Sequence, residues 1–180
     1  MLPELRTERL LLRPWRASDR PAFAQINADS RVVECLPGVM TRDESDAMVD
    51  RIEAHIERHG FGLWAVEVPG QVEFIGFIGL AIPTFEAPFT PCVEIGWRLD
   101  ADHWGRGYAS EGARAALAFG FASLGLDEIV SFTVPHNLRS RRVMEKIGMT
   151  RDQAGDFDHP RLPEGHTLRQ HVLYRLKRPR

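Results

Sequence analysis

The sequence predicts one domain of the α/β or α+β class, and three observations support this. Short apolar and β-branched segments typical of strands alternate with longer segments whose apolar residues recur three or four positions apart, as on one face of a helix. The 180 residues suffice for one packed core and include no repeat, linker or low-complexity segment. The composition, 43% hydrophobic and 27% charged, is typical of a folded protein. We therefore expect a single domain over residues 1–180.

The N-terminal half is expected to hold a strand, two helices and two further strands, in that order. Ser18 and Asp19 are typical N-cap residues for the first helix. The second helix begins at the capping box Thr41-Arg42-Asp43-Glu44, whose side chains satisfy free amides at a helix start. The short turn Pro69-Gly70-Gln71 favours an antiparallel hairpin between the two later strands. The expected bounds are 9–15 for the first strand, 41–60 for the second helix, and 61–68 and 72–82 for the hairpin strands.

The C-terminal half predicts three more strands and two helices. After a proline-rich loop, residues 92–99 form a strand, and a glycine-bearing turn then leads into the clearest helix, at residues 109–124. Gly112 and Gly120 lie on the apolar stripe of this helix, where close packing against the sheet explains them best. The chain is completed by a β-branched strand at 128–134 and a short basic helix at 137–147. An irregular polar segment follows, and a closing strand is expected at 166–176.

Charge and cysteine content narrow the class of function. The 23 basic and 25 acidic side chains give a net charge of −2, so no general attraction to nucleic acid or to an anionic membrane is expected. Cys35 and Cys92 lie far apart and form no CxxC pair, which indicates neither a metal knuckle nor a disulfide framework. The first residues make a poor signal peptide, and no apolar segment reaches membrane-spanning length. We expect a cytoplasmic monomer or homodimer.

The segment HWGRGYASEG, residues 103–112, is the first indication of function. A strand, a glycine turn and a helix in this order can bind phosphate, because free amides and the helix dipole favour an anion at a helix N-terminus. Gly105 and Gly107 would let a pyrophosphate approach those amides, and Arg106 would either add charge or point to solvent. The turn lacks both the GKS or GKT ending of a P-loop and the GxGxxG of a dinucleotide fold. On this evidence alone, a plain tight turn is an equal alternative.

Several motifs in register resemble the GNAT acetyltransferases, and most closely their RimJ/RimL-like branch. That branch has Gln or Arg, two residues, Gly, one residue, then Gly or Ala at the turn. Residues 104–109, WGRGYA, fit every position except the first, where Trp104 stands. Asn137, Ser140 and the later EKIGM, residues 145–149, resemble the family's NxxS and EKxGF segment. The order of elements matches the family over nearly the whole chain.

The resemblance implies a GNAT-like fold and an acetyl-CoA-dependent N-acetyltransferase. The fold would be a mixed, mostly antiparallel, twisted sheet of about seven strands with helices on both faces. Acetyl-CoA would lie in a cleft where the parallel strands at 92–99 and 128–134 splay apart. The acceptor would be a primary amine, of a protein N-terminus or of a small molecule. The resemblance assigns coenzyme binding to Trp97, Arg98, Leu99, Trp104, Gly105, Arg106, Gly107, Tyr108, Ala109, Ser110, Asn137 and Arg142.

Two of these assignments have structural alternatives. Asn137 would contact the pantetheine arm of the coenzyme, or it would be a helix N-cap, and the two roles can coexist. Arg142 belongs to a basic helix together with Arg139, Arg141 and Lys146. These side chains would either meet the 3′-phosphate of the coenzyme or form a solvated face.

Acetyl transfer from a thioester requires that the amine lose a proton, that the oxyanion find a donor, and that the thiolate leave. By resemblance, a strand amide near residues 97–99 would be the oxyanion donor. Glu94 is the candidate base, with an ion pair to a basic neighbour as its alternative. Many relatives carry a tyrosine as general acid where this chain has Met144. By resemblance to the RimL-like branch, in which a nearby serine takes this role, Ser140 is the candidate acid, and a local backbone hydrogen bond is its alternative.

The rival interpretation is a non-catalytic acyl-CoA-binding or regulatory module of the same fold. Met144 favours this rival, whereas the intact glycines, Glu94 and Ser140 favour an enzyme. A nucleotide-phosphate enzyme is excluded by the missing P-loop lysine and by the strand order. No metal is expected, because the three histidines of residues 159–171 fit no standard zinc spacing. They are better interpreted as part of the acceptor-pocket wall.

Overall fold

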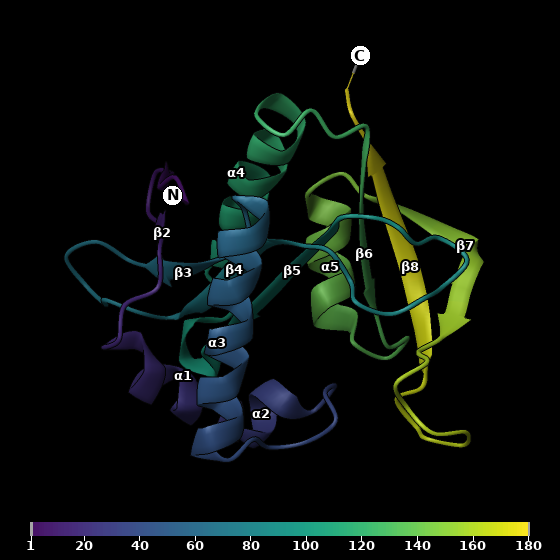
Figure 1. The fold of residues 1–180 in the computed structure, drawn as a ribbon, viewed down its shortest axis with the longest axis horizontal. Coiled ribbons are helices and arrows are strands. Elements are labelled where there is room, and N and C mark those ends of the chain that lie inside the picture. Colours follow the sequence, from purple (N-terminus) through teal and green to yellow (C-terminus); the bar gives the residue numbers. More distant parts are fainter. Residues whose placement is uncertain (1, 180) are drawn as a thin grey trace.

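The computed structural model describes residues 2–179, in which one open sheet runs through the molecule (Figure 1). The sheet has eight strands in the order β1-β2-β3-β4-β5-β6-β8-β7. Neighbouring strands are antiparallel except β5 and β6, which are parallel. This confirms the predicted mixed, mostly antiparallel sheet. The strands are β1 (Leu5–Arg6), β2 (Leu11–Arg13), β3 (Leu63–Glu67), β4 (Gly76–Ala81), β5 (Glu94–Leu99), β6 (Glu128–Thr133), β7 (Thr150–Asp158) and β8 (Gln170–Lys177).

Helices cover both faces of the sheet, as predicted. The helices are α1 (Asp19–Ala28), α2 (Ser30–Val33), α3 (Arg42–His59), α4 (Tyr108–Ala122) and α5 (Leu138–Lys146), with a short 3₁₀ turn at Ala101–His103. α1 and α3 pack on one face, and α4 and α5 pack on the other; α3 crosses in front of the strands in Figure 1. None of the helices within residues 2–179 combines the length and the apolar character needed to cross a bilayer.

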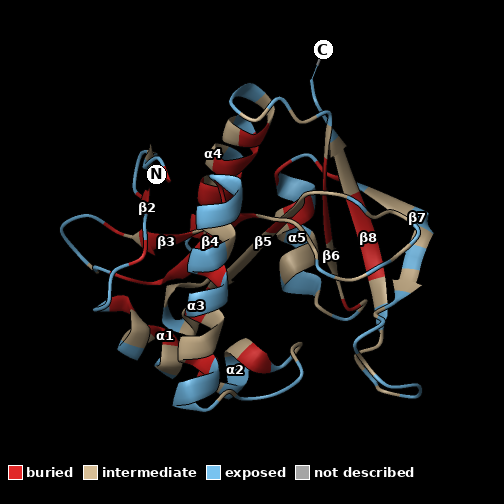
Figure 2. Cartoon of the chain, viewed as in Figure 1, coloured by how far each residue is buried: buried red, intermediate tan, exposed pale blue. Residues whose placement is uncertain are grey.

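Alternating side chains of the central strands supply two cores. Trp64 on β3 and Ile78 on β4 belong to the core under α4. Ala65 and Phe77, one residue away on the same strands, belong to the core under α1 and α3. This alternation follows from the pleat of a strand, which turns successive side chains to opposite faces. Buried residues therefore concentrate on the central strands and on the inner sides of the helices (Figure 2).

The glycines on the stripe of α4 pack against the sheet, as the sequence predicts. A Cβ atom at Gly112 would lie 2.5 Å from Cδ1 of Ile78. At Gly120 a Cβ atom would lie 2.7 Å from Cδ1 of Ile129. Both distances are too short for carbon atoms, so α4 can approach the sheet this closely because these two positions have no side chain.

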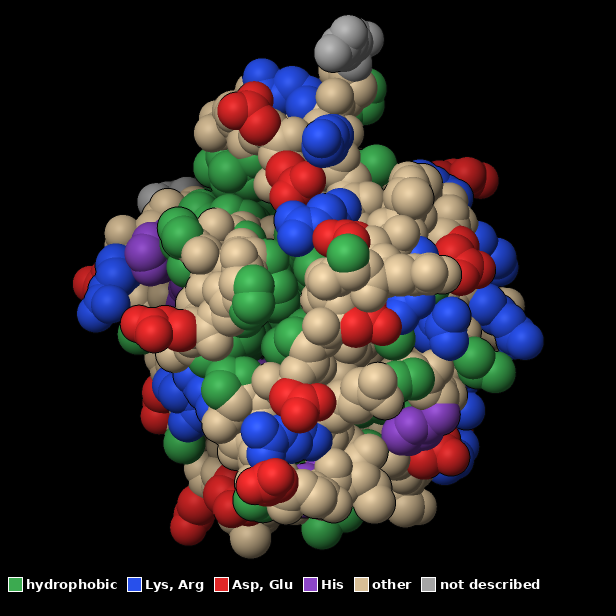
Figure 3. Space-filling model, turned by 90° about the vertical axis from the view of Figure 1, so that its right-hand side faces the viewer, with side chains coloured by type: hydrophobic (Ala, Val, Ile, Leu, Met, Phe, Trp, Pro, Cys, Tyr) green, Lys and Arg blue, Asp and Glu red, His purple; other side chains and the backbone are tan. Residues whose placement is uncertain are grey.

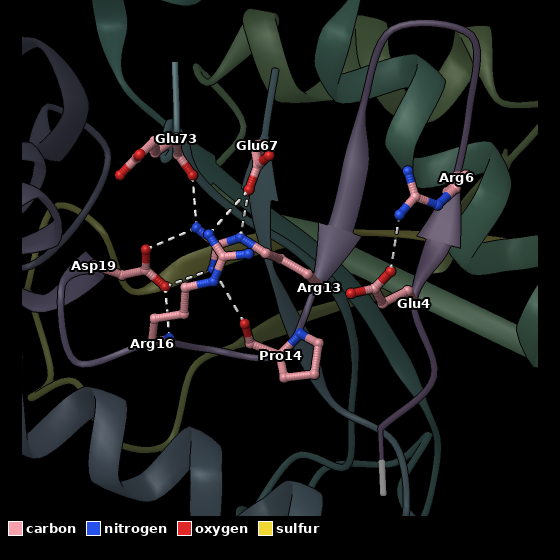
Figure 4. A network of polar contacts seen from close by, with 8 residues as sticks. All are labelled: Glu4, Arg6, Arg13, Pro14, Arg16, Asp19, Glu67 and Glu73. Carbon is pink, nitrogen blue, oxygen red and sulfur yellow. Dashed lines mark hydrogen bonds and ion pairs between the residues drawn. The ribbon is translucent and has the colours of Figure 1, made fainter. Parts of the chain in front are cut away.

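A buried arginine, Arg13, joins β2 to the start of α1, to β3 and to the segment before β4 (Figure 4). The Arg13 side chain is 1% exposed and donates from Nη1 and Nη2 to the two carboxylate oxygens of Asp19, each at 2.8 Å. Its Nε donates to Glu67 at 2.8 Å, and its remaining hydrogen bonds reach the carbonyls of Pro14 and Glu73. A buried cation is tolerated when its charge and its donors are satisfied in this way.

The structure differs from the sequence prediction in the C-terminal segment, where the predicted irregular stretch is strand β7. The sequence gives no strand signal here because β7 lies at the sheet edge and is polar on both sides, so apolar alternation is absent. Ion pairs hold it instead: Arg175 on β8 contacts Asp152 at 2.7 Å, and Arg151 pairs with Asp156. Acidic and basic side chains are interspersed over this side of the molecule (Figure 3).

Two smaller predictions also change. Ser18, one of the two N-cap candidates, is at the N-cap position of α1, but its side chain makes no capping hydrogen bond. The carboxylate of Asp19, the other candidate and the first residue of α1, accepts from the Arg16 amide at 2.7 Å and from Arg13. The second hairpin strand begins at Gly76, four residues later than predicted from 72, although the hairpin itself is confirmed by the antiparallel pairing of β3 and β4. The helix predicted at 41–60 and the helix at 109–124 are confirmed.

We expect Thr41→Ala to lower the free energy of unfolding by about 1 kcal/mol. The Thr41 hydroxyl accepts from the Glu44 amide at 3.3 Å, while the Glu44 carboxylate accepts from the Thr41 amide at 2.7 Å, so the variant loses one half of a complete capping box. Urea denaturation measures the change. Thr167→Ala is the matched control, because Thr167 is an exposed loop residue; equal stability of the two variants would contradict the capping role.

Candidate active site

β5 and β6 pair for one step and then part. Their parallel ladder places Glu94 opposite Val130, and the Val130 amide donates to the Val93 carbonyl at 2.9 Å. At the next step the hydroxyl of Ser131 donates to the Ile95 carbonyl at 2.8 Å. Beyond Ile95, no backbone pairing joins the two strands within the described chain. β5 and β6 therefore form a fork.

Free backbone groups of β5 face the open side of this fork. The Asp100 amide donates to the Ile75 carbonyl on the β4 side, at 2.9 Å. Because amides alternate in direction along a strand, even-numbered residues of β5 turn theirs toward β4 and odd-numbered residues turn theirs toward β6. The N–H and C=O of Trp97 therefore face the gap, and the described part of β6 offers them no partner. This edge of β5 can pair with a ligand.

A cavity of about 490 Å³ opens at the fork, and most of the predicted site residues line it. They are Glu94, Trp97, Arg98, Leu99, Trp104, Gly105, Gly107, Tyr108, Ala109, Ser110, Asn137, Ser140 and Arg142. Arg106 is the exception, because its side chain is exposed and its guanidinium contacts the Asp102 carbonyl at 3.4 Å. Segments that are far apart in the sequence thus meet in one space.

The turn before α4 presents free amides to the cavity. Gly105 and Gly107 have φ angles of +75° and +83°, in the left-handed region that favours glycine. Within residues 2–179, no amide of residues 105–110 donates a hydrogen bond; the first that does is Glu111, to the Gly107 carbonyl at 3.0 Å. These amides and the positive end of the α4 dipole make a local anion site in a protein with balanced charge.

Contacts from elsewhere in the chain fix the shape of this turn. The Glu111 carboxylate accepts from the Thr7 hydroxyl at 2.6 Å and from the Arg9 amide at 2.8 Å. The Arg9 guanidinium also donates to Glu111 and to the Arg106 carbonyl, the latter at 3.0 Å. On the other side, the Trp104 indole donates to the Leu99 carbonyl at 2.9 Å. The turn is therefore held in place before any ligand arrives.

Glu94 is a half-buried carboxyl group in the cavity wall. Burial raises its pKa to about 8, because the surrounding protein disfavours the charged form. The ion pair considered as its alternative role is not formed, since no basic side chain among residues 2–179 lies within 4.0 Å of its oxygens. A carboxyl group with this pKa can accept a proton near neutral pH.

Asn137 and Ser140 lie together at the start of α5. The Asn137 Oδ1 accepts from the Ser140 amide at 3.2 Å, which confirms the N-cap. Its Nδ2 donates to the Thr133 hydroxyl at 3.0 Å and to the Ser140 hydroxyl oxygen at 3.2 Å. The backbone bond considered as the alternative for Ser140 is absent from the described contacts, so its hydroxyl proton remains available on the cavity side.

The rest of α5 supplies an apolar wall and a basic rim. Met144 is buried and lines the cavity, where its thioether cannot donate a proton. Arg139 pairs with Glu34 at 2.6 Å, and Arg141 donates to the Tyr174 hydroxyl at 3.2 Å. Arg142 and Lys146 line the cavity and form no ion pair with the described residues.

Sequence reasoning missed the wall formed by α2 and the residues after it. Val32, Cys35 and Leu36 line the cavity from this side. A signal was present, since the Asp29 side chain accepts from the Arg31 amide at 2.8 Å as an N-cap. Four helical residues are too few to show the periodic spacing of apolar residues that indicates a helix, so the sequence predicts a loop here.

The C-terminal histidines do not line the cavity. The rings of His159 and His171 lie 5.1 Å apart and pack among Phe85, Phe132 and Phe157. Burial lowers the pKa of both histidines, so they are neutral near pH 7. Phe132 separates this aromatic group from the cavity, since it belongs to both. No three metal-ligating side chains within residues 2–179 are arranged to hold an ion.

Comparisons with known proteins agree with this geometry. Residues 9–150 match the model of the acetyltransferase (GNAT) domain. The chain is 31% identical to FsC-acetyl coenzyme A-N(2)-transacetylase of Aspergillus fumigatus, over 98% of this chain and 80% of that protein. An acetyltransferase structure from Agrobacterium tumefaciens is similar with a TM-score of 0.79 at 32% identity, covering 99% of this chain and 96% of that one.

RimJ of Mycobacterium smegmatis, solved in complex with CoA-disulfide, shares the fold with a TM-score of 0.75 at 23% identity, over 98% of this chain and 86% of that one. The family match covers well over half of the chain and includes the fork, the glycine turn and the whole of α5. The chain therefore belongs to the GNAT acetyltransferase family and is an acetyl-CoA-dependent N-acetyltransferase.

Proposed function

We propose that the protein acetylates a primary amine by direct attack of that amine on the thioester of acetyl-CoA, as in the RimJ/RimL-like branch. The observation that carries this proposal is that one cavity joins three parts of the required chemistry. It holds the free amides of residues 105–110, the unpaired edge of β5 and the Glu94 carboxyl group. The branch is supported by the motifs WGRGYA and NxxS.

The coenzyme would lie along the open side of the fork. Its pyrophosphate would bind the amides of residues 105–110, and its amide-rich pantetheine arm would pair with the free backbone edge at residues 97–99. Asn137 would border the arm while it caps α5. Arg142 and Lys146, which have no acidic partner among the described residues, would neutralise the 3′-phosphate.

The chemistry would then use groups around the same point of β5. Glu94 would take the proton from the attacking amine, for which its pKa of about 8 is suited. The N–H of Trp97, which faces the gap, would donate to the oxyanion of the tetrahedral intermediate. The hydroxyl of Ser140 would give its proton to the departing thiolate. No covalent bond to the protein is needed.

We expect Ser140→Ala to lower kcat by about tenfold, which is less than the roughly hundredfold or larger effect typical of a general acid. A thiol has a pKa of about 8.5, so the thiolate is a good leaving group and needs limited help. Steady-state kinetics with saturating acetyl-CoA measures the effect. Ser123→Ala, which changes a serine at the far end of α4, is the control. If the two variants are equally active, Ser140 is not the acid.

Calorimetric titration of the protein with acetyl-CoA, and with NAD and ATP as controls, tests the coenzyme site directly. We expect selective binding of acetyl-CoA, because the cavity offers a long unpaired strand edge besides a phosphate site. Product formation with a panel of primary amines then tests the transfer. Binding of acetyl-CoA without acetylation of any amine would favour the non-catalytic acyl-CoA-binding module.

A further inference from the structure

Arg98 occupies a position in the cavity that coenzyme binding does not explain. Side chains of alternate residues on a strand share one face, so Glu94, Gly96 and Arg98 lie in a row on β5. This is the face that carries α1 and α3, since Arg98 lies over the Phe77 ring at 5.7 Å and contacts Asn27 of α1. The row thus runs along the side of the cavity that α2 encloses.

The middle of this row is open. Gly96 has no side chain, and a Cβ atom built there would have one neighbour within 4 Å, the Glu94 Oε1 at 4.0 Å. The walls beside it are apolar, with Val32, Leu36 and Phe77. A small molecule can therefore lie over Gly96 with one end at the Glu94 carboxyl group and the other at the Arg98 guanidinium.

The Arg98 guanidinium lacks an anionic partner. Its Nη1 donates to the Asn27 Oδ1 at 2.6 Å, and the sulfur atoms of Met40 and Met48 lie 4.0 and 3.7 Å from the same nitrogen. Its Nε and Nη2 make no hydrogen bond to residues 2–179, neither nitrogen is fully buried, and the residue lines the cavity. Burial lowers the pKa of this arginine to about 10, which still leaves it charged at neutral pH.

Arg13 shows how this chain treats a buried arginine that has a structural role. Its three guanidinium nitrogens all donate, to two carboxylates and two carbonyls (Figure 4). Arg98 has one amide oxygen and no carboxylate within 4.0 Å among the described residues. An unpaired cation in a low-dielectric site is unfavourable in the free protein, and an anion that enters the cavity removes that cost.

We propose that Arg98 binds a carboxylate of the acceptor and so selects amines that also carry a carboxylate group. The proposal rests on the proposed function, because it takes this side of the cavity as the acceptor site. The two free nitrogens of a planar guanidinium fit a carboxylate with two parallel hydrogen bonds. With the carboxylate held at Arg98, the amine end lies over Gly96 toward Glu94, which is the group that would take its proton.

Binding of matched probes to the protein saturated with coenzyme A tests the proposal without any need for turnover. The probes are glycine, 4-aminobutanoate and 6-aminohexanoate, each compared with its carboxamide by calorimetry. We expect at least one of the carboxylates to bind about tenfold or more tightly than its amide, because a charge-assisted hydrogen bond is lost in the amide. Arg98→Gln should abolish that ratio, and Arg98→Lys should retain part of it.

Controls separate this proposal from the other roles that Arg98 could have. Arg42→Gln, at an exposed arginine of α3 that does not line the cavity, should keep the wild-type ratio. The affinity for acetyl-CoA should be the same in wild type and Arg98→Gln. If Arg98→Gln keeps the melting temperature of the wild type but loses acetyl-CoA binding, Arg98 serves the coenzyme and the proposal is wrong, while the proposed function stands.

The two proposals fail in different ways. If no carboxylate binds better than its amide to the wild-type protein, the acceptor-carboxylate site is overturned, whether or not amines are acetylated. If the Arg98-dependent preference is present but no amine in the series is acetylated, the carboxylate site stands and the proposed transfer fails. Because the wild-type ratio alone decides the first point, poor folding of Arg98→Gln does not weaken the test.

Discussion

Glu94→Gln should lower kcat about a hundredfold or more, because a glutamine amide cannot take the proton from the attacking amine. The variant keeps the shape of the side chain and removes its acid–base function. The group has no ion pair within the described residues, so its replacement leaves no orphaned partner. Acetyl-CoA affinity, measured by calorimetry, should stay unchanged, which separates a catalytic defect from a binding defect.

The pH dependence of kcat/KM of the wild-type enzyme should reflect the ionisation of Glu94. A raised carboxyl pKa means that Glu94 is protonated below about pH 8 and ionised above it. As the base must be ionised, kcat/KM should rise with pH through about 8, and this rise should be absent in Glu94→Gln. Glu128→Gln, on the neighbouring strand and paired with Arg175, is the control and should keep the wild-type profile. A profile unchanged in Glu94→Gln would exclude Glu94 as the base.

Gly107→Val should weaken acetyl-CoA binding about a hundredfold. Gly107 has a φ of +83°, which a β-branched residue adopts only with strain, so the turn would shift and misalign its amides. The new side chain would also crowd the Arg9 guanidinium, because a Cβ atom built at Gly107 lies 3.4 Å from Nη2 of Arg9, which helps to hold the turn. Loss of one or two charge-assisted hydrogen bonds to the phosphates accounts for an effect of this size. Calorimetric titration with acetyl-CoA measures it.

Gly60→Val is the matched control for this second experiment. Gly60 ends α3 with a φ of +74°, and no atom lies within 4 Å of a Cβ built there, so the valine imposes similar backbone strain away from the cavity. Both variants should be less stable than wild type, and Gly107→Val alone should lose acetyl-CoA affinity. An equal loss in the two would show that general destabilisation, rather than the turn, is responsible.

The sequence predicts those elements whose signals are local. The helix at Tyr108–Ala122 follows from spacing and small residues, and the α3 helix follows from its capping box and the terminal Gly60. β7 could not be predicted, because a polar edge strand is formed by pairing with β8 and by ion pairs such as that between Arg175 and Asp152, whose partners lie far apart in sequence.

The candidate site likewise has features that the sequence predicts from local signals and features that depend on the whole fold. The glycine turn and the cap at Asn137 are visible in the sequence because each depends on a few adjacent residues. The direction of the Arg98 side chain is not, since it depends on the sheet face that its position in β5 gives it. The sequence also does not predict that Glu94 has no ion pair among the described residues, because this depends on where distant basic side chains lie in the fold.

The fork also bears on how the protein holds together. The sheet has two parts, β1-β2-β3-β4-β5 and β6-β8-β7. The backbone ladder that joins them is a single residue pair, Glu94 with Val130. A molecule that binds both the turn at residues 105–110, which follows β5, and the start of α5, which follows β6, would link segments attached to the two parts of the sheet. Its binding would then raise the free energy of unfolding, by about 2.7 kcal/mol at a ligand concentration of one hundred times Kd. The concentration of acetyl-CoA would thus affect both the rate of the enzyme and its stability against unfolding.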